Sequence, residues 1–315
     1  MENKGSCVVT GGAGFIGSHL CDRLLVHGYR VIALDNFITS RKENLADASK
    51  NPNFTFVELD VVEPLKQLNN IFFIFHLASP ASPIDYQKYP EETALANSQG
   101  TRNLLQLAKK TGARFLFAST SEIYGDPKEH PQKETYWGNV NPNGLRACYD
   151  EAKRFGEMLS MVYHRRDGLD VRIARIFNTY GPRMRPNDGR VVSTLINQAI
   201  ANEPLTVYGD GSQTRSFCYV SDMADGLVKL MFTDGIAGEV VNVGNPEEYR
   251  ILDLAQKIKV MTGATSTVVF KPLPEDDPKE RQPEITKAKK LLGWEPTVSV
   301  EDGLQKTIAY YKSLQ

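Results

Sequence analysis

The sequence is poor in cysteine, in net charge and in long apolar runs, and each shortage excludes a class of protein. Only 4 cysteines occur in 315 residues, scattered and without a C-x-x-C pair, so a reducing compartment fits better than a disulfide scaffold. The formal net charge of -1 gives no indication of a nucleic acid or an anionic membrane as partner. No apolar run is long enough to span a bilayer, and the first predicted strand follows Met1 too closely for a signal peptide. We therefore expect a cytoplasmic protein without a membrane segment.

The sequence also shows no pattern typical of a metal site or of a repeat protein. The 5 histidines show no metal-ligand spacing, so we expect no metal site. No internal repeat or low-complexity tract occurs, and Cys7 and Cys21 stand in apolar surroundings that predict small core residues. The length suits a two-lobed enzyme or one large α/β domain.

A glycine-rich stretch near the start carries the first positive signal. Residues 7–9 predict a buried strand, and residues 18–25 have apolar side chains at helical spacing. Between them, Gly11 allows a tight turn, Gly14 lets the backbone approach a pyrophosphate, and Gly17 lets helix and strand pack closely. Glycines in such a turn can serve packing alone. The helix N-terminus that follows would nevertheless favour phosphate groups.

A second strand strengthens the dinucleotide interpretation. Residues 31–34 predict a strand that ends in Asp35 and Asn36. An acid at this distance fits a ribose 2′-OH and would repel a 2′-phosphate, which favours NAD over NADP. Arg41 and Lys42 lie nearby and weaken that preference.

Further apolar segments complete a predicted parallel sheet. Residues 54–58, 71–75 and 114–118 predict strands, and residues 93–110 predict a helix that ends before Gly112. The alternation of strands and helices indicates an α/β protein with a doubly wound, Rossmann-type parallel sheet. Asp60, which follows the third strand, could approach an adenine amine or simply be a solvated strand end.

Two groups of polar residues follow these elements. Ser119 to Gly125 places hydroxyl groups and the Glu122 carboxylate at the end of a predicted strand, although helix capping would explain them equally well. Tyr149 and Lys153 share one face of a helix predicted to run to about Arg166. An ammonium beside a tyrosine favours the phenolate and would lower the pKa of the phenol. After a dinucleotide fingerprint, this pair indicates a catalytic site.

The second half of the chain predicts a smaller α/β lobe. Helices are expected over residues 191–202, 220–232, 251–261 and 301–311, with a short strand over residues 205–208. Ser221 and Asp222 give the cap signal for the second of these helices.

Taken together, these motifs resemble the UDP-glucuronate decarboxylases, also called UDP-xylose synthases, of the extended short-chain dehydrogenase/reductase superfamily. The resemblance covers essentially the whole chain. Residues 143–145 read Asn-Gly-Leu where the family usually has Ile-Gly-Pro, and Ala152 stands where it often has Gly. The resemblance rests on residues 76–83, 119–122, 139–142, 175–183, 188–192, 203–211, 213–217 and 292–296.

The resemblance implies NAD as cofactor and a UDP-sugar as substrate. It implies an NAD-binding domain over residues 1–177 and a mainly substrate-binding lobe over residues 178–315, with some segments returning to the first domain. The implied cofactor residues are Gly11, Gly14, Phe15, Ile16, Gly17, Asp35, Asn36, Asp60, Val61, Leu77, Ala78, Ser79, Tyr149 and Lys153. The implied substrate residues are Pro80, Glu122, Asn178, Arg190, Val191, Tyr208, Arg215 and Arg281.

It also implies a reaction: oxidation of the sugar at C4, loss of CO2, and reduction back at C4 to give UDP-xylose. Tyr149 would take the C4 hydroxyl proton, Lys153 would hold Tyr149 ionised or bind the ribose, and Thr120 would bond the C4 oxygen. Glu122 and Arg281 would orient the ring and the carboxylate, with Glu122 also able to handle a proton or water. The family usually forms homodimers through the helices that begin near Thr93 and Tyr149, whose apolar residues could equally be internal core.

Other activities stay open at this point. A decarboxylase that releases the 4-keto pentose and NADH would share nearly all of these residues. A 4-epimerase would not need Glu122 or Arg281, and a 4,6-dehydratase usually has Asp where Ser121 stands. A non-enzymatic, NAD-sensing regulator on the same fold could dispense with the Tyr149 and Lys153 pair.

Overall fold

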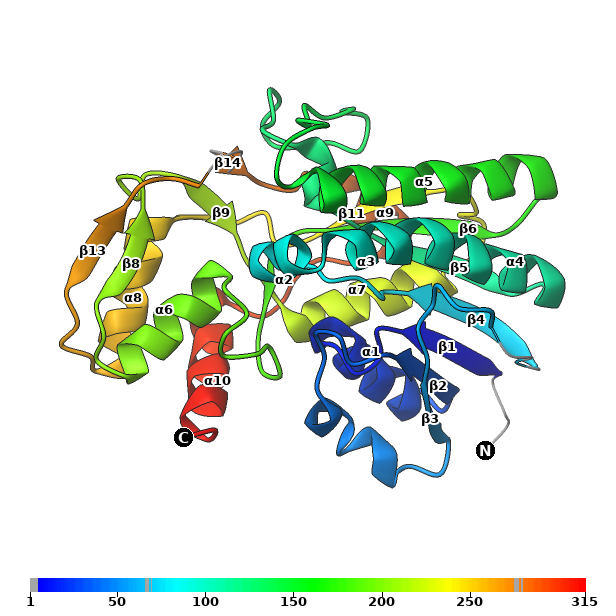
Figure 1. Ribbon diagram of the computed structural model, residues 1–315, viewed down its shortest axis with the longest axis horizontal. Helices are drawn as coiled ribbons and strands as arrows, with labels where there is room; N and C mark the ends of the chain where they lie inside the picture. Colours follow the sequence, from blue (N-terminus) through cyan, green and yellow to red (C-terminus); the bar gives the residue numbers. More distant parts are fainter. Residues whose placement is uncertain (1–4, 66–67, 69, 275–277, 279) are drawn as a thin grey trace.

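A seven-stranded parallel sheet forms the centre of the larger lobe in the computed structural model, which describes residues 5–65, 68, 70–274, 278 and 280–315 (Figure 1). The acidic residues 275–277 that precede Arg281 thus lie outside the described residues. The strand order is β11-β6-β5-β4-β1-β2-β3, and every neighbouring pair is parallel. The strands are β1 Ser6–Thr10, β2 Arg30–Asp35, β3 Phe54–Glu58, β4 Ile71–His76, β5 Arg114–Thr120, β6 Val171–Ile176 and β11 Val240–Val243.

Helices cover both faces of this sheet, as its apolar strands require. One face packs against α1 (Phe15–Val26), α7 (Val220–Phe232) and α9 (Thr286–Leu292). The other face packs against α4 (Thr101–Thr111) and α5 (Ala147–Asp167), with α3 (Pro90–Leu95) lying alongside α5. The Rossmann-type α/β fold is confirmed, and so are the five predicted strands of the first half.

The predicted helix over residues 93–110 is not one regular α-helix. A π-helical segment, η3 (Ala96–Gly100), separates α3 from α4. Such segments are frequent at functional sites. Here Asn97 in η3 donates from Nδ2 to Ser79 Oγ at 2.8 Å, so the irregular turn touches the loop that follows β4.

The smaller lobe has its own buried core (Figure 1). It contains α6 (Val191–Ile200), α8 (Ile251–Thr262) and α10 (Val300–Lys312), which confirm three of the predicted helices. The short strands of this lobe are β8 Leu205–Tyr208 beside β13 Val268–Lys271, and β9 Thr214–Ser216 between β12 Glu248–Arg250 and β14 Glu280–Arg281. A further pair, β7 Thr179–Tyr180 and β10 Cys218–Tyr219, lies at the start of α7.

Helix α7 is confirmed, but the predicted cap is wrong. The N-cap position is Tyr219, and the side chain of Asp222 turns away from its own helix. Its carboxylate accepts hydrogen bonds from the backbone N–H groups of Thr297 and Val298, both at 2.9 Å. The acid therefore ties α7 to the segment that leads into α10, a tertiary role that local spacing does not reveal.

Candidate active site

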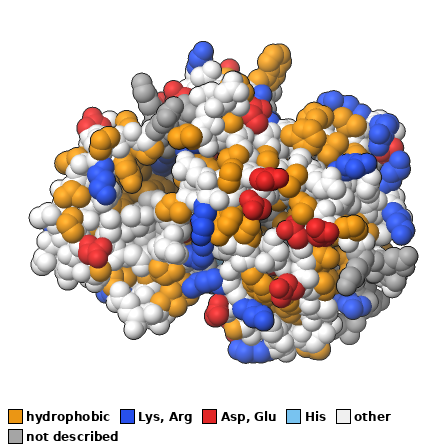
Figure 2. Space-filling view, in the orientation of Figure 1, with side chains coloured by type: hydrophobic (Ala, Val, Ile, Leu, Met, Phe, Trp, Pro, Cys, Tyr) orange, Lys and Arg blue, Asp and Glu red, His pale blue; other side chains and the backbone are white. Residues whose placement is uncertain are grey.

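The C-terminal ends of the parallel strands face a cavity of about 570 Å³ between the two lobes. Strand order reverses between β1 and β4, which is where ligands bind in sheets of this kind. Figure 2 shows basic side chains along the cleft between the two lobes. Of the described residues that the sequence predicted for the site, all except Arg281 line this one cavity.

The glycine turn leaves room for a phosphate group. Gly11 has φ +68, which an L side chain rarely adopts. A Cβ at Gly14 would lie 3.0 Å from the carbonyl oxygen of Gly11, and one at Gly17 would lie 2.0 Å from it. These positions accept only hydrogen without moving the backbone. The first turn of α1 therefore stands open to the cavity, with N–H groups that lack intrahelical partners.

Asp35 is fixed beside this turn. Its carboxylate accepts hydrogen bonds from Ala13 N at 2.9 Å, Phe37 N at 2.9 Å and Ser40 Oγ at 2.6 Å. The side chain is buried and lines the cavity, so its charge stands where an adenosine ribose would bind and where a 2′-phosphate would be repelled. The glycine turn and this acid together fit NAD.

Hydrogen bonds also fix the loop after β4, which we expect to lie beside the nicotinamide end of the cofactor. Thr10 Oγ1 accepts from the backbone N–H groups of Leu77 and Ala78, both at 3.2 Å. The His76 ring lies between Thr10 Oγ1 and Thr101 Oγ1, at 2.8 and 3.1 Å. Burial lowers the pKa of His76 to about 3, so this histidine is neutral and structural. The loop can thus present its backbone to a nicotinamide without ordering cost.

Tyr149 and Lys153 lie where helix α5 meets the end of β5. Burial raises the pKa of Tyr149 to about 12, while a hydrogen bond with Thr120 acts in the opposite direction. Lys153 donates to the carbonyl oxygen of Ala118 at 2.7 Å, and its Nζ is 5.8 Å from the centre of the Tyr149 ring. The sequence led us to expect a lowered pKa for this phenol. In the structure, burial raises the pKa of Tyr149 instead.

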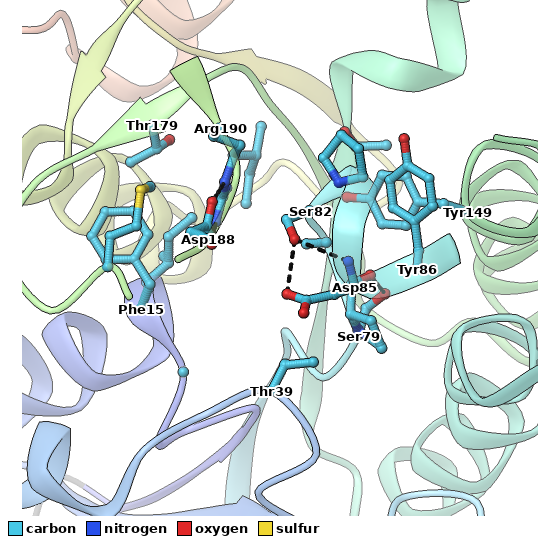
Figure 3. Close-up of a pocket in the computed structure, with 18 of the residues that line it drawn as sticks. Phe15, Thr39, Ser79, Ser82, Asp85, Tyr86, Tyr149, Thr179, Asp188 and Arg190 are labelled. Carbon is cyan, nitrogen blue, oxygen red and sulfur yellow. Dashed lines mark hydrogen bonds and ion pairs between the residues drawn. The ribbon is translucent and has the colours of Figure 1, made fainter. Parts of the chain in front are cut away.

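A second tyrosine packs on the first. The rings of Tyr86 and Tyr149 are stacked with their centres 5.2 Å apart and their planes 6° from parallel. Figure 3 shows both rings on one side of the cavity, with Phe15, Asp188 and Arg190 on the other. The sequence analysis missed Tyr86. Its position, three residues after Pro83 at the start of the short helix α2 (Pro83–Lys88), was the available signal.

Glu122 is clamped between two guanidinium groups. Arg281 Nη1 donates to Glu122 Oε1 at 2.8 Å, and Arg146 Nη2 donates to Oε2 through a short bond. Burial alone would raise the pKa of Glu122, but Arg281, Arg146 and Arg215 outweigh it and lower the pKa to about 2. Glu122 is therefore a fixed anion near neutral pH. In this state it can accept hydrogen bonds from a ligand.

Arg281 lies behind Glu122 in this arrangement. Its guanidinium is 1 % exposed and also donates to Ser121 Oγ at 3.0 Å and to the carbonyl oxygen of Gly125 at 2.9 Å. Arg146 was missed by the sequence analysis. Its place one turn ahead of Asp150 on α5, three residues before Tyr149, was the only sequence signal for it.

Further arginines line the wall toward the small lobe. Arg190 forms a two-pronged ion pair with Asp188, at 2.5 and 2.9 Å. Arg215 donates to the carbonyl oxygens of Thr214 at 2.8 Å and Pro278 at 2.5 Å. Both side chains line the cavity and could bind phosphate oxygens. The predicted substrate residues Pro80, Asn178, Val191 and Tyr208 also line it.

Comparisons with known proteins agree with this geometry. The model of the NAD dependent epimerase/dehydratase family matches residues 7–244. The chain is 55% identical over 306 residues to UDP-glucuronic acid decarboxylase 1 of Arabidopsis thaliana, covering 97% of this chain and 69% of that protein. It is 54% identical over 310 residues to UDP-glucuronic acid decarboxylase 1 of Danio rerio, covering 98% and 73%.

Solved structures give the same result at lower identity. The UDP-glucuronic acid 4-epimerase of Bacillus cereus, solved in complex with UDP-glucuronic acid and NAD, superposes with a TM-score of 0.90 at 33% identity. That comparison covers 98% of this chain and 100% of the epimerase.

Proposed function

Because this chain belongs to the NAD dependent epimerase/dehydratase family, we propose that it decarboxylates UDP-glucuronate to UDP-xylose and CO2. The observation that carries the proposal is the cluster of Glu122, Arg146 and Arg281 directly behind Thr120 and Tyr149. An oxidation site beside a buried guanidinium cluster suits a sugar that carries a carboxylate next to the carbon to be oxidised.

The cofactor is NAD, and several described residues would hold it. The turn from Gly11 to Gly17 would bind the pyrophosphate, Asp35 the adenosine ribose, and the loop at Leu77 to Ser79 with Lys153 the nicotinamide end. Bound NAD supplies a reversible two-electron oxidation at C4 of the sugar, so the reaction has no net redox change.

The chemistry requires a carbonyl at C4, since direct loss of CO2 would leave an unstabilised carbanion at C5. A C4 carbonyl lies β to the carboxylate and accepts the electron pair as an enolate. Tyr149 acts in this step as its phenolate, the form that the Lys153 ammonium favours; it takes the C4 hydroxyl proton, and Thr120 donates a hydrogen bond to the same oxygen. The C5–C6 bond then breaks, CO2 departs, and C5 takes a proton from the solvent while Tyr149 and Thr120 stabilise the enolate oxygen. Tyr149 returns its proton when the C4 alcohol is restored.

Lys153 and Glu122 have different duties in this scheme. The ammonium of Lys153 keeps positive charge near the phenol and offers a donor to the ribose. Glu122, as a permanent anion, accepts hydrogen bonds from the ring and keeps Arg281 oriented. Arg281 does not line the cavity, so it acts on the sugar carboxylate indirectly, as part of the charge cluster that it forms with Glu122 and Arg146.

The test is direct. Purified protein with its bound NAD is incubated with carboxyl-labelled UDP-glucuronate, and labelled CO2, the nucleotide-sugar products and NADH absorbance are followed together. We expect CO2 and UDP-xylose in equal amounts with no accumulation of NADH. A 4-keto pentose with stoichiometric NADH would indicate the product-releasing decarboxylase. UDP-galacturonate without CO2 would indicate a 4-epimerase and would overturn the proposal.

We also infer a homodimer through α5 and α3. Helix α5 carries Phe155, Met158 and Val162 at spacings of three and four residues, exposed by 42%, 49% and 37%. Leu95 of the neighbouring α3 is 41% exposed. Such a stripe on two adjacent helices favours packing against a second copy of the chain. Light scattering should give twice the chain mass, and Met158→Glu should shift it toward the monomer.

The remaining expectations are proposals about organisation and location. We infer that residues 1–177, together with the returning segments α7, β11 and α9, form the NAD-binding domain and that the rest of residues 178–315 mainly binds the UDP-sugar. All four cysteines are free thiols, which supports a cytoplasmic location for the protein. Within the described ranges, no helix combines the length and apolar character needed to cross a membrane. Cell fractionation would test the location.

A further inference from the structure

A buried polar chain runs beneath the site and joins helix α5 to the ends of three strands. Glu157 is at its centre, one helical turn after Lys153. Its Oε1 accepts from Ser119 Oγ at 2.6 Å and from Arg175 Nε at 3.0 Å, and its Oε2 accepts from Arg175 Nη2 at 2.9 Å. Neither the glycine turn nor the Tyr149 reaction explains this acid.

The chain continues away from the cavity through Arg175. Arg175 Nη1 donates to the hydroxyl oxygen of Tyr124 at 3.0 Å, and the Tyr124 hydroxyl donates to Asn242 Oδ1 at 2.7 Å. The guanidinium carbon also lies 5.0 Å from the centre of the Tyr124 ring. Arg175 is thus held by groups on α5, η4 and β11 at once, which fixes the Glu157 carboxylate that it binds.

A nearby negative charge favours the ammonium form of Lys153, which is buried in apolar surroundings. Lys153 is 3 % exposed, and its Nζ lies 5.0 Å from the centre of the Phe117 ring. Burial lowers the pKa of Lys153 to about 7, and Glu157 opposes that effect. An apolar setting without a compensating anion would leave the amine largely neutral at physiological pH.

Among the residues that the structure describes, the other groups around Lys153 supply no such anion. Without bound NAD, burial favours the neutral phenol at Tyr149 on the same helix, and burial also keeps His76 of β4 neutral. Strand β5 contributes the Ala118 carbonyl, and Arg175 of β6 is a cation that pairs with Glu157. The buried residues of η3 and α4 that pack toward this helix, such as Asn97 and Thr101, carry no charge.

We propose that Glu157 is a positioning residue for the reaction: from one helical turn away it raises the ammonium fraction of Lys153 and, through Ser119, it fixes the strand end that carries Thr120. The Glu157 carboxylate thereby influences both the charge of Lys153, which neighbours Tyr149, and the position of the Thr120 hydroxyl. The inference rests on the proposed function for its role in turnover, but the charge of Lys153 is measurable without substrate.

The experiment titrates Lys153 in the NAD-bound protein by NMR of ¹³C-labelled lysine, with Lys153→Met used for assignment. In Glu157→Gln the pKa of Lys153 should fall by about one to two pH units, the effect of losing an opposite charge one helical turn away. Glu151→Gln is the matched control. Glu151 lies on the exposed face of α5 with Arg154 at 3.5 Å, so its loss should leave the titration of Lys153 unchanged.

Kinetics give the second readout. The fall in kcat/KM toward high pH should begin about one to two pH units lower in Glu157→Gln, and Glu157→Asp should restore its position. An unchanged Lys153 titration in Glu157→Gln, or a loss of activity that is equal at every pH, would overturn the inference. Absence of CO2 release by the wild-type protein would instead overturn the proposed function.

A loss of stability in Glu157→Gln could be mistaken for an effect on the pKa of Lys153, so a control for stability is needed. Glu157→Gln leaves Arg175 short of its ion-pair partner, so the double variant Glu157→Gln, Arg175→Met is titrated as well. Replacing both partners of a buried pair is far less costly than removing one. The pKa of Lys153 should also fall in the double variant, and a wild-type titration there would contradict the electrostatic role.

Discussion

The variant Arg281→Ala allows the contribution of the Glu122 cluster to stability to be measured separately from its contribution to catalysis. The guanidinium makes hydrogen bonds to Ser121, Glu122 and Gly125 and is 1 % exposed. Its removal deprives a buried carboxylate of one of its two direct guanidinium contacts. Breaking a buried pair in this way costs about 3–5 kcal/mol. For a chain of this size, that lowers the melting temperature by roughly 5–15 °C.

The same variant should lose catalysis. Decarboxylation relies on the charge cluster around Glu122, so we expect CO2 release to fall by about 10²–10³-fold. Bound NAD should be retained, because the glycine turn and Asp35 lie elsewhere in the cavity. The measurements are labelled CO2 release, the NAD content of the purified protein, and thermal unfolding by calorimetry.

A double variant tells whether the activity loss is only the loss of stability. In Glu122→Gln, Arg281→Met both partners are replaced, which should bring stability back to within about 1–2 kcal/mol of the wild type. Activity should stay low. If the stable double variant released CO2 at the wild-type rate, the cluster would be a structural pair and our account of the carboxylate site would be refuted.

Three further outcomes follow from the geometry. Tyr149→Phe should keep bound NAD and lose nearly all CO2 release, by about 10²–10⁴-fold, because the proton acceptor is gone; full activity would remove the phenol from the mechanism. Gly17→Ala should yield protein without NAD, since its Cβ would meet the Gly11 carbonyl oxygen at 2.0 Å; an NAD content equal to wild type would contradict the tight turn. Because the folded pKa of Glu122, about 2, lies below its ordinary value of 4.5, its ionisation stabilises the fold above that value and the stabilisation is lost as pH falls through 2. Urea unfolding of Glu122→Gln should therefore depend less on pH over this window than that of the wild type, and parallel curves would count against the shifted pKa.

Local sequence patterns were sufficient for much of the first lobe. The predicted strands at residues 7–9, 31–34, 54–58, 71–75 and 114–118 all lie within observed strands, because continuous apolar runs suit a sheet covered on both faces. The glycine turn and the Tyr149–Lys153 face were likewise local features, four residues or fewer in spacing.

Strand β6 was not predicted, and its arginines explain why. Arg172 and Arg175 interrupt its apolar run, although Arg172 is fully buried. Arg172 donates to the carbonyl oxygen of Leu230 at 2.6 Å, and Arg175 pairs with Glu157. Arg172 also pairs with Asp170, just before the strand, at 3.1 Å. The partners on α7 and α5 are distant in the sequence, so no spacing within the strand predicts them.

The charge state of the site was equally beyond local reasoning. Glu122 meets Arg146 at a separation of 24 residues and Arg281 at 159. Its low pKa depends on contacts that exist only after folding. The raised pKa of Tyr149 has the same origin, because burial is a property of the packed molecule.

The return of β11 and α7 to the large sheet has a consequence for how the molecule can be divided. A fragment ending at Phe177 would leave the outer edge of β6 open, and it would strip the sheet of Met223, Leu227 and Leu230. Open strand edges and bare apolar faces promote aggregation. During synthesis, the first lobe is therefore incomplete until β11, α7 and α9 have all been made, and we expect a fragment of residues 1–177 to aggregate when it is expressed alone.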